Sequence, residues 1–180
     1  MVFMSEPDEV LNQFATVLEH ADTIYTTGIG KSAHVARYFA DVLTSIGKPS
    51  FFIDPVSAVH GDLGRLAYAA PVVVFTNSGA TEELRPFLVA AQWSNHFLFV
   101  TGQRDYPLKE FARISITIGS EGEGNRLGFP GDSIVKSTMF CAAMTAELAE
   151  RLDVTEKEYK VIHPGGAIGK RLSNVRENNA

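Results

Sequence analysis

Two short segments of the chain combine glycines with hydroxyl, amide and charged side chains. The segment Thr27-Gly28-Ile29-Gly30-Lys31-Ser32 offers closely approachable backbone N–H groups, a lysine charge and a serine hydroxyl. The segment Thr76-Asn77-Ser78-Gly79-Ala80-Thr81-Glu82-Glu83 places four hydroxyl or amide side chains around a glycine. Such donors suit a phosphate group, and two of these turns on neighbouring strands would form one phosphate cradle.

Both turns also have a purely structural interpretation. The first could be a tight turn with a solvated lysine. In the second, Ser78 or Thr81 could cap a helix whose first turn carries Glu82 and Glu83. The first segment is neither a P-loop nor a dinucleotide-binding loop, because tyrosine and alanine stand where those motifs need glycine. Helix capping explains the two acids, but not the similar turn after the first predicted strand.

Some of the histidines are candidates for catalysis and others are not. His60 lies in a predicted loop beside Gly61-Asp62, and His163 precedes Pro164-Gly165-Gly166, so both are candidates for chemistry. His34, one turn into a predicted helix, is a weaker candidate. The other two histidines, His20 and His96, are interpreted as surface or core residues. The spacing of the histidines gives no metal-binding pattern, and we expect no metal site.

The bulk composition is that of an ordinary globular domain. The chain has 180 residues, of which 45% are apolar, and its net charge of −5 argues against a nucleic-acid partner. The single cysteine, Cys141, lies in an apolar run and is expected to be buried. Residues 1–10 do not resemble a signal peptide and no apolar run is long enough to span a membrane, so we expect a cytoplasmic protein without a membrane partner.

These candidate residues need a scaffold, and the pattern of the chain predicts one. Short β-branched runs alternate with helical patterns, which predicts a single domain over residues 1–180, with residues 1–10 and 173–180 frayed. Its fold class is α/β, a three-layer α/β/α sandwich around a five-stranded parallel sheet, with ligands at the carboxyl ends of the strands. The expected strands are 23–27, 50–53, 71–75, 97–100 and 114–118, and the expected helices start at Lys31 and near Leu84 and span Ser133–Leu152.

Four segments occur in an order that resembles a known family. They are Gly28-Ile29-Gly30-Lys31-Ser32, Ala58-Val59-His60-Gly61-Asp62-Leu63-Gly64, Asn77-Ser78-Gly79, and the run from His163 to Leu172 that begins His-Pro-Gly-Gly. Together they resemble sugar isomerase (SIS) domains, closely those of arabinose 5-phosphate isomerases, from about Thr23 to Leu172. The resemblance implies an isomerase that interconverts ribulose 5-phosphate and arabinose 5-phosphate without a cofactor. It also implies a homodimer or homotetramer, because SIS domains form sites between subunits.

The resemblance also implies roles for particular residues. The family's catalytic positions fall on Lys31, Glu83, Glu123, His60 and His163, with Glu121 as the alternative to Glu123. Either glutamate could be the base, with a slight preference for Glu123, because a helix start stabilises the anion of Glu83. Which histidine assists ring opening stays open. The implied phosphate-binding positions are Ser32, Thr76, Asn77, Ser78 and Thr81.

Two departures from the family leave alternatives open. Many arabinose 5-phosphate isomerases carry a Pro-Thr-Ser-Ser-Thr run before the long helix, whereas this chain has Phe129-Pro130-Gly131-Asp132-Ser133. Many also carry C-terminal cystathionine-β-synthase-type modules, and we expect no regulation through such modules here. The first departure leaves the exact sugar open, so one alternative is an isomerase of another phosphosugar, such as a hexulose 6-phosphate. The other alternative is a non-catalytic SIS sensor of sugar phosphates, because SIS domains also serve in transcription regulators.

Overall fold

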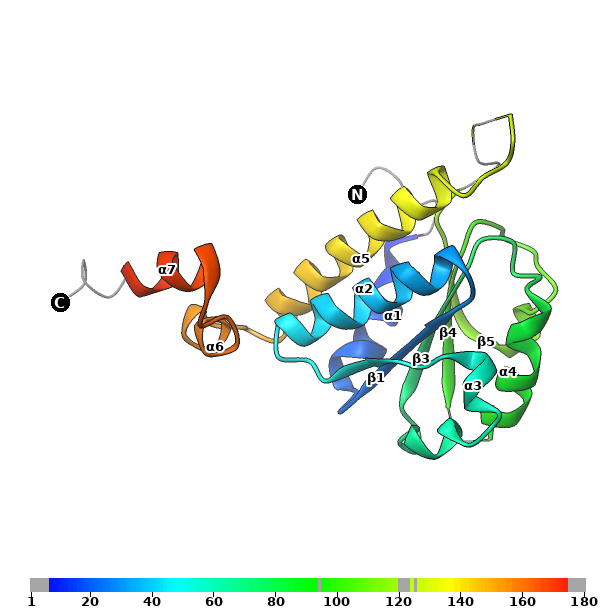
Figure 1. The fold of residues 1–180 in the computed structure, drawn as a ribbon, viewed down its shortest axis with the longest axis horizontal. Helices are drawn as coiled ribbons and strands as arrows, with labels where there is room; N and C mark the ends of the chain where they lie inside the picture. The colour runs from blue at the N-terminus through cyan, green and yellow to red at the C-terminus, as the bar shows by residue number, and fades with distance from the viewer. Residues whose placement is uncertain (1–6, 94, 120–123, 125, 175–180) are drawn as a thin grey trace.

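A computed structural model describes residues 7–93, 95–119, 124 and 126–174. Its centre is a sheet of five parallel strands in the order β2-β1-β3-β4-β5, which confirms the expected fold class (Figure 1). Each strand lies within two residues of its predicted position. The strands are β1 (Ile24–Gly28), β2 (Ser50–Phe52), β3 (Pro71–Thr76), β4 (His96–Thr101) and β5 (Ala112–Thr117).

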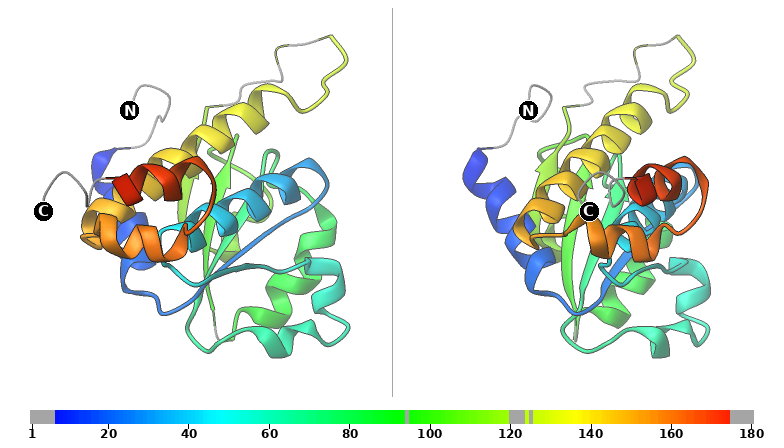
Figure 2. Two further views of the ribbon diagram at one scale, coloured as in Figure 1. Left: turned by 60° about the vertical axis from the view of Figure 1, so that its left-hand side comes forward. Right: turned by 90° about the vertical axis from the view of Figure 1, so that its left-hand side faces the viewer.

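Helices cover both faces of the sheet. On one face α1 (Asp8–His20), α2 (Lys31–Ser45) and α5 (Asp132–Arg151) pack around one apolar cluster, with α2 and α5 side by side (Figures 1 and 2). On the other face α3 (Pro55–Ala58) and α4 (Arg85–Ala91) pack around a second cluster. The central strand β3 supplies alternate residues to the two clusters, which explains why its sequence is apolar throughout.

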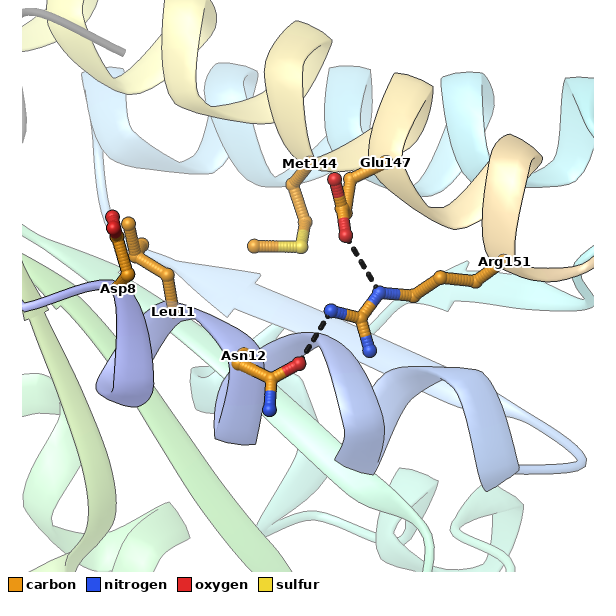
Figure 3. Close-up of a pocket in the computed structure, with 6 residues that line it drawn as sticks. All are labelled: Asp8, Leu11, Asn12, Met144, Glu147 and Arg151. Carbon is orange, nitrogen blue, oxygen red and sulfur yellow. Dashed lines mark hydrogen bonds and ion pairs between the residues drawn. The ribbon is translucent and has the colours of Figure 1, made fainter.

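Helix α1 has no counterpart among the elements expected from the sequence. It packs on α5 through the edge-to-face rings of Phe14 and Phe140, whose centroids are 5.5 Å apart. Arg151 of α5 joins the two helices at their surface, because its guanidinium donates to Glu147 at 2.8 Å and to Asn12 of α1 at 2.6 Å (Figure 3). The hollow of about 180 Å³ beside them is therefore part of the contact between α1 and α5 and not a ligand site, because the Arg151 guanidinium already donates to protein oxygens.

Two short helices follow α5 and form an arm. Helix α6 (Glu156–Ile162) begins with a capping box, in which the Thr155 hydroxyl accepts from Glu158 N at 3.2 Å and the Glu158 carboxylate accepts from Thr155 N at 3.0 Å. Helix α7 (Gly166–Asn174) turns back on α6. Figure 1 shows this arm extending away from the sheet, and Figure 2 shows it turned toward the viewer.

Parts of the two stretches expected to fray are helical where the structure describes them. Helix α1 starts at Asp8, inside the stretch 1–10, and α7 continues to Asn174, inside the stretch 173–180. Apolar residues of α1, among them Phe14 and Leu18, are fully buried, and packing of this kind orders a short helix that would fray alone. The remaining residues of both stretches lie outside the part described.

Phe140 offers a test of the core, because its ring contacts both Phe14 of α1 and Phe39 of α2. We expect Phe140→Ala to lower the free energy of unfolding by about 3–5 kcal/mol, the usual cost of removing a large buried aromatic. Chemical denaturation followed by circular dichroism measures it. The matched control is Tyr68→Ala at a side chain 78% exposed, and a loss at Phe140 no larger than at Tyr68 would contradict this account of the core.

Candidate active site at the carboxyl edge of the sheet

The strand order reverses at one point, between β1 and β3. The chain leaves β1 toward β2 on one side and then returns to add β3 on the other side of β1. The connections after β1 and β3 therefore diverge, and open parallel sheets bind ligands outside the carboxyl ends of the strands at such a point. The two hydroxyl-bearing turns singled out from the sequence are the turns that flank this point.

The turn after β1 brings the start of α2 directly against the end of β3. A side chain at Gly28 would place its Cβ 3.0 Å from the carbonyl oxygen of Phe75 and 3.0 Å from the carbonyl carbon of Ser32, so any larger residue would press against both backbones. Gly30 has a φ of 58°, a left-handed conformation that glycine adopts without strain. Lys31 then opens α2 with an exposed side chain, and Ser32 is half-buried behind it.

The turn after β3 is held by its own hydroxyl groups. The buried Thr76 Oγ1 accepts a hydrogen bond from Gly79 N at 3.2 Å and lies 3.3 Å from Thr81 Oγ1. The Ser78 hydroxyl is exposed and accepts from Ala80 N at 3.2 Å. Thr76 thus shapes the turn from inside, whereas the exposed Ser78 and half-buried Thr81 are the hydroxyls within reach of a ligand.

The neighbouring strand β4 fixes the same turn from the other side. The Asn77 carbonyl accepts hydrogen bonds from Gly102 N at 3.0 Å and from the Thr101 hydroxyl at 3.2 Å. Thr101 pairs with Thr76 in the sheet register, so both strands end in threonine at the same level. Sequence reasoning missed Thr101 and Gly102, although a hydroxyl residue and a glycine directly after an apolar strand repeat the pattern at Thr27-Gly28.

Two further candidates, Glu83 and His60, come from segments that pack on the second face of the sheet. Glu83 is exposed in the short 3-10 helix η2 (Glu82–Leu84), between the β3 turn and α4. His60 is exposed after α3, whose start is capped by Asp54 through hydrogen bonds from Val56 N and Ser57 N. Because α3 packs against η2 and α4, the structure brings the segments that carry His60 and Glu83 together.

His163 is not part of this group within one chain. It ends α6, where its Nδ1 lies 3.0 Å from the Tyr159 carbonyl and its ring is 4.1 Å from the Tyr159 ring. The preceding residue, Ile162, faces Gly47 beyond the far end of α2, at the amino edge of the sheet. With 15 residues, α2 is about 22 Å long, and this length separates His163 from Lys31.

The second predicted glutamate, Glu123, and its alternative Glu121 lie outside the described residues. The described residues on either side are held together. Lys136 of α5 donates to the Gly119 carbonyl at 2.8 Å and pairs with Asp132 at 2.7 Å. This contact keeps the exit of β5 at the start of α5, and it pairs the Asp132 carboxylate with a positive charge.

Comparison with known proteins decides the family. The model of the SIS domain matches residues 17–147. The chain belongs to the SIS domain family. The Pseudomonas aeruginosa arabinose 5-phosphate isomerase KdsD is 30% identical over 168 residues, which cover 92% of this chain and 51% of that protein. The Salmonella typhi arabinose 5-phosphate isomerase GutQ is 31% identical over 163 residues, covering 89% and 51%.

Solved structures agree with this assignment of the SIS domain. A protein of Escherichia coli CFT073, solved in complex with arabinose 5-phosphate, superposes with a TM-score of 0.81 at 28% identity, covering 89% of this chain and 87% of that chain. The chain spans about half the length of the curated relatives it matches. Among the residues that the structure describes, no helix is long and apolar enough to cross a membrane.

The exposed hydroxyl of Ser78 provides a direct test of the anion site. We expect Ser78→Ala to weaken inorganic phosphate binding by about 1–3 kcal/mol, the range for a lost hydrogen bond to a charged group. Titration followed by ³¹P NMR measures the dissociation constant. The control is Ser57→Ala, at an exposed serine of α3. An equal dissociation constant for both variants and the unaltered protein would place the anion elsewhere.

Proposed function

We propose that this SIS domain is an aldose–ketose isomerase of a phosphosugar, and that it interconverts ribulose 5-phosphate and arabinose 5-phosphate. The observation that carries the proposal is the pair of glycine- and hydroxyl-rich turns at the switch point of the sheet. The names of the relatives, KdsD and GutQ, and the arabinose 5-phosphate complex of the Escherichia coli protein support the substrate class. A cytoplasmic location and the absence of a cofactor remain part of the proposal.

In this proposal the phosphate binds to the two turns and the sugar chain extends from it. The backbone N–H groups at the start of α2 and the hydroxyls of Ser32, Ser78 and Thr81 hold the phosphate oxygens. Lys31, at the first position of α2, stabilises negative charge on the phosphate or on the reacting oxygens. Thr76 and Asn77 remain proposed phosphate-binding positions, and they also shape the turn, because Thr76 Oγ1 and the Asn77 carbonyl accept hydrogen bonds from the turn and from the end of β4.

The chemistry then requires two proton transfers. A carboxylate base removes the proton from the carbon next to the carbonyl, which yields an enediolate, and the same group returns the proton to the former carbonyl carbon. A proton also moves between the two substrate oxygens, and a histidine suits this transfer because it titrates near neutral pH. No electrons leave the substrate, so the reaction consumes no redox partner. Glu83 and Glu123 are the proposed bases, with His60 and His163 as proton carriers.

A carboxylate acts best as a base when it is removed from water, and Glu83 is exposed in the single chain. We therefore propose a homodimer or homotetramer in which a neighbour covers the site and supplies His163. The arm that carries His163 supports this arrangement, because it extends from the fold with exposed apolar side chains on both helices. The most exposed of them is Val161 at 76%, with Ile162 and Ile168 also exposed.

Conservative substitution of the glutamates tests the base. If Glu83 is the base, Glu83→Gln should lower kcat by about 10²–10⁴-fold while sugar-phosphate binding survives, because the amide keeps the shape and loses the basicity. The same assay on Glu123→Gln decides between the two positions, and Glu82→Gln is the adjacent exposed control. Near-normal kcat in both variants would indicate that a histidine, and not either glutamate, is the base.

Mixing two inactive variants tests the shared site. If His163 enters a neighbour's site, a mixed dimer of His163→Ala and Glu83→Gln chains contains one site with neither substitution. The mixture should therefore regain activity that neither parent shows, and light scattering should detect at least a dimer. A fully active monomer would contradict the proposed assembly.

The reaction itself is tested on a panel of pentose and hexose phosphates incubated in D₂O. Isomerisation through an enediolate exchanges a carbon-bound proton, which NMR detects even at equilibrium. Exchange with arabinose 5-phosphate is the expected result. Exchange confined to another sugar would identify a different isomerase, as the altered stretch before α5 allows, and binding without exchange would identify a sensor.

A further inference from the structure

The segment that follows β4 folds back against the turn after β3. Leu108 N donates to the Gly79 carbonyl at 3.1 Å, and this bond ties the returning segment to the Ser78-Gly79 turn. Tyr106 lies between the two, with a side chain only 8% exposed. A nearly buried tyrosine directly behind a turn with an exposed hydroxyl is in a position to control the shape of that turn.

Tyr106 makes three contacts that fix its ring. The ring stacks on Phe99 of β4, with centroids 5.5 Å apart and an angle of 30° between the planes. The phenol oxygen lies 2.6 Å from the Ser115 hydroxyl of β5, within a strong hydrogen bond. The inner part of the ring faces Gly79, where an added Cβ would come within 2.5 Å of three Tyr106 carbons. The ring thus connects the turn after β3 to both β4 and β5.

The conformation of Gly79 explains why the turn needs the contact with Tyr106. Its φ of 62° is left-handed, and glycine reaches many other conformations at little cost, so the turn needs an external constraint to stay in one of them. Direct contact with the Tyr106 ring removes the space into which Gly79 would move. A turn held this way presents its N–H groups and the Ser78 hydroxyl in a fixed direction, which an anion site needs because hydrogen bonds weaken steeply off their ideal geometry.

We propose that Tyr106 is a positioning residue for phosphate binding: it holds the Ser78-Gly79 turn in its anion-binding shape and is itself anchored by Ser115. The inference rests on the proposed function only in taking this turn as the phosphate site. The hydroxyl is required because phenylalanine would keep the stacking on Phe99 but lose the anchor on β5. Burial raises the pKa of Tyr106, so the phenol stays protonated and the bond persists across neutral pH.

Removing the anchor from either end tests the proposal. Tyr106→Phe and Ser115→Ala delete the same hydrogen bond, and each should raise the dissociation constant of inorganic phosphate, and the KM for the sugar phosphate, about three- to tenfold. The kcat should change less than twofold, because the reacting groups are untouched. The double variant should be no worse than the single ones. Tyr68→Phe, at the most exposed tyrosine of those described, is the control.

A purely structural tyrosine would give a different pattern. Both variants would then melt at a lower temperature while phosphate affinity and KM stayed at the values of the unaltered protein, and this outcome would overturn the proposal. Independent, additive losses in the two single variants would overturn it as well. Ser115→Ala leaves the aromatic ring in place, so it gives the answer even if Tyr106→Phe does not fold.

The inference and the proposed function fail in distinguishable ways. Weakened phosphate binding in both variants, together with no isomerisation of any sugar on the panel, would overturn the function and leave the role of Tyr106 standing. Isomerisation together with unchanged phosphate affinity and KM would overturn the role of Tyr106 and leave the function standing.

Discussion

The contact between β1, β3 and the first turn of α2 is the constraint on which the site depends. At Gly28 the backbones approach so closely that a Cβ would meet both the Phe75 and the Ser32 carbonyl groups. This approach puts the start of α2 beside the end of β3, at the point where the strand order reverses. The helix N-terminus and the Thr76–Thr81 turn therefore lie at the same edge of the sheet, and a phosphate held there could use donors from both without any large cluster of positive charge.

The two edges of the sheet carry different structural features. The carboxyl edge carries the turns and exposed polar side chains suited to a ligand, and successive hydrogen bonds from β4 and the Tyr106 segment brace the turn after β3. The amino edge carries the α6–α7 arm and a second set of contacts around Gly47. Since α2 and α5 span the distance between the edges, one chain does not bring His163 to Lys31, and the proposed site therefore takes His163 from another copy.

The sequence was sufficient for the scaffold because its signals are local. Apolar runs, glycines at strand ends and helical periodicity predicted all five strands and the long helices α2 and α5. Helix α1 was missed, since its order depends on packing against distant segments such as the Phe14–Phe140 contact. Helix α6 was missed although its capping box from Thr155 to Glu158 is a local signal. The local sequence also could not predict where His163 lies. A His-Pro-Gly-Gly segment indicates a family position, but only the path of α5 and α6 shows which edge of the sheet this segment occupies. Tyr106 gave no signal because its role arises from contacts with Gly79, Phe99 and Ser115 in three different segments.

The central claim is that a sugar phosphate binds with its phosphate between the turns after β1 and β3. A crystal structure of the full chain with arabinose 5-phosphate tests it most directly. The account predicts phosphate oxygens within about 2.7–3.1 Å of the Ser78 hydroxyl and of backbone N–H groups at the start of α2. It also predicts His163 of a neighbouring copy near the sugar. A phosphate bound away from both turns, for example beside Arg151 in the hollow between α1 and α5, would contradict the account.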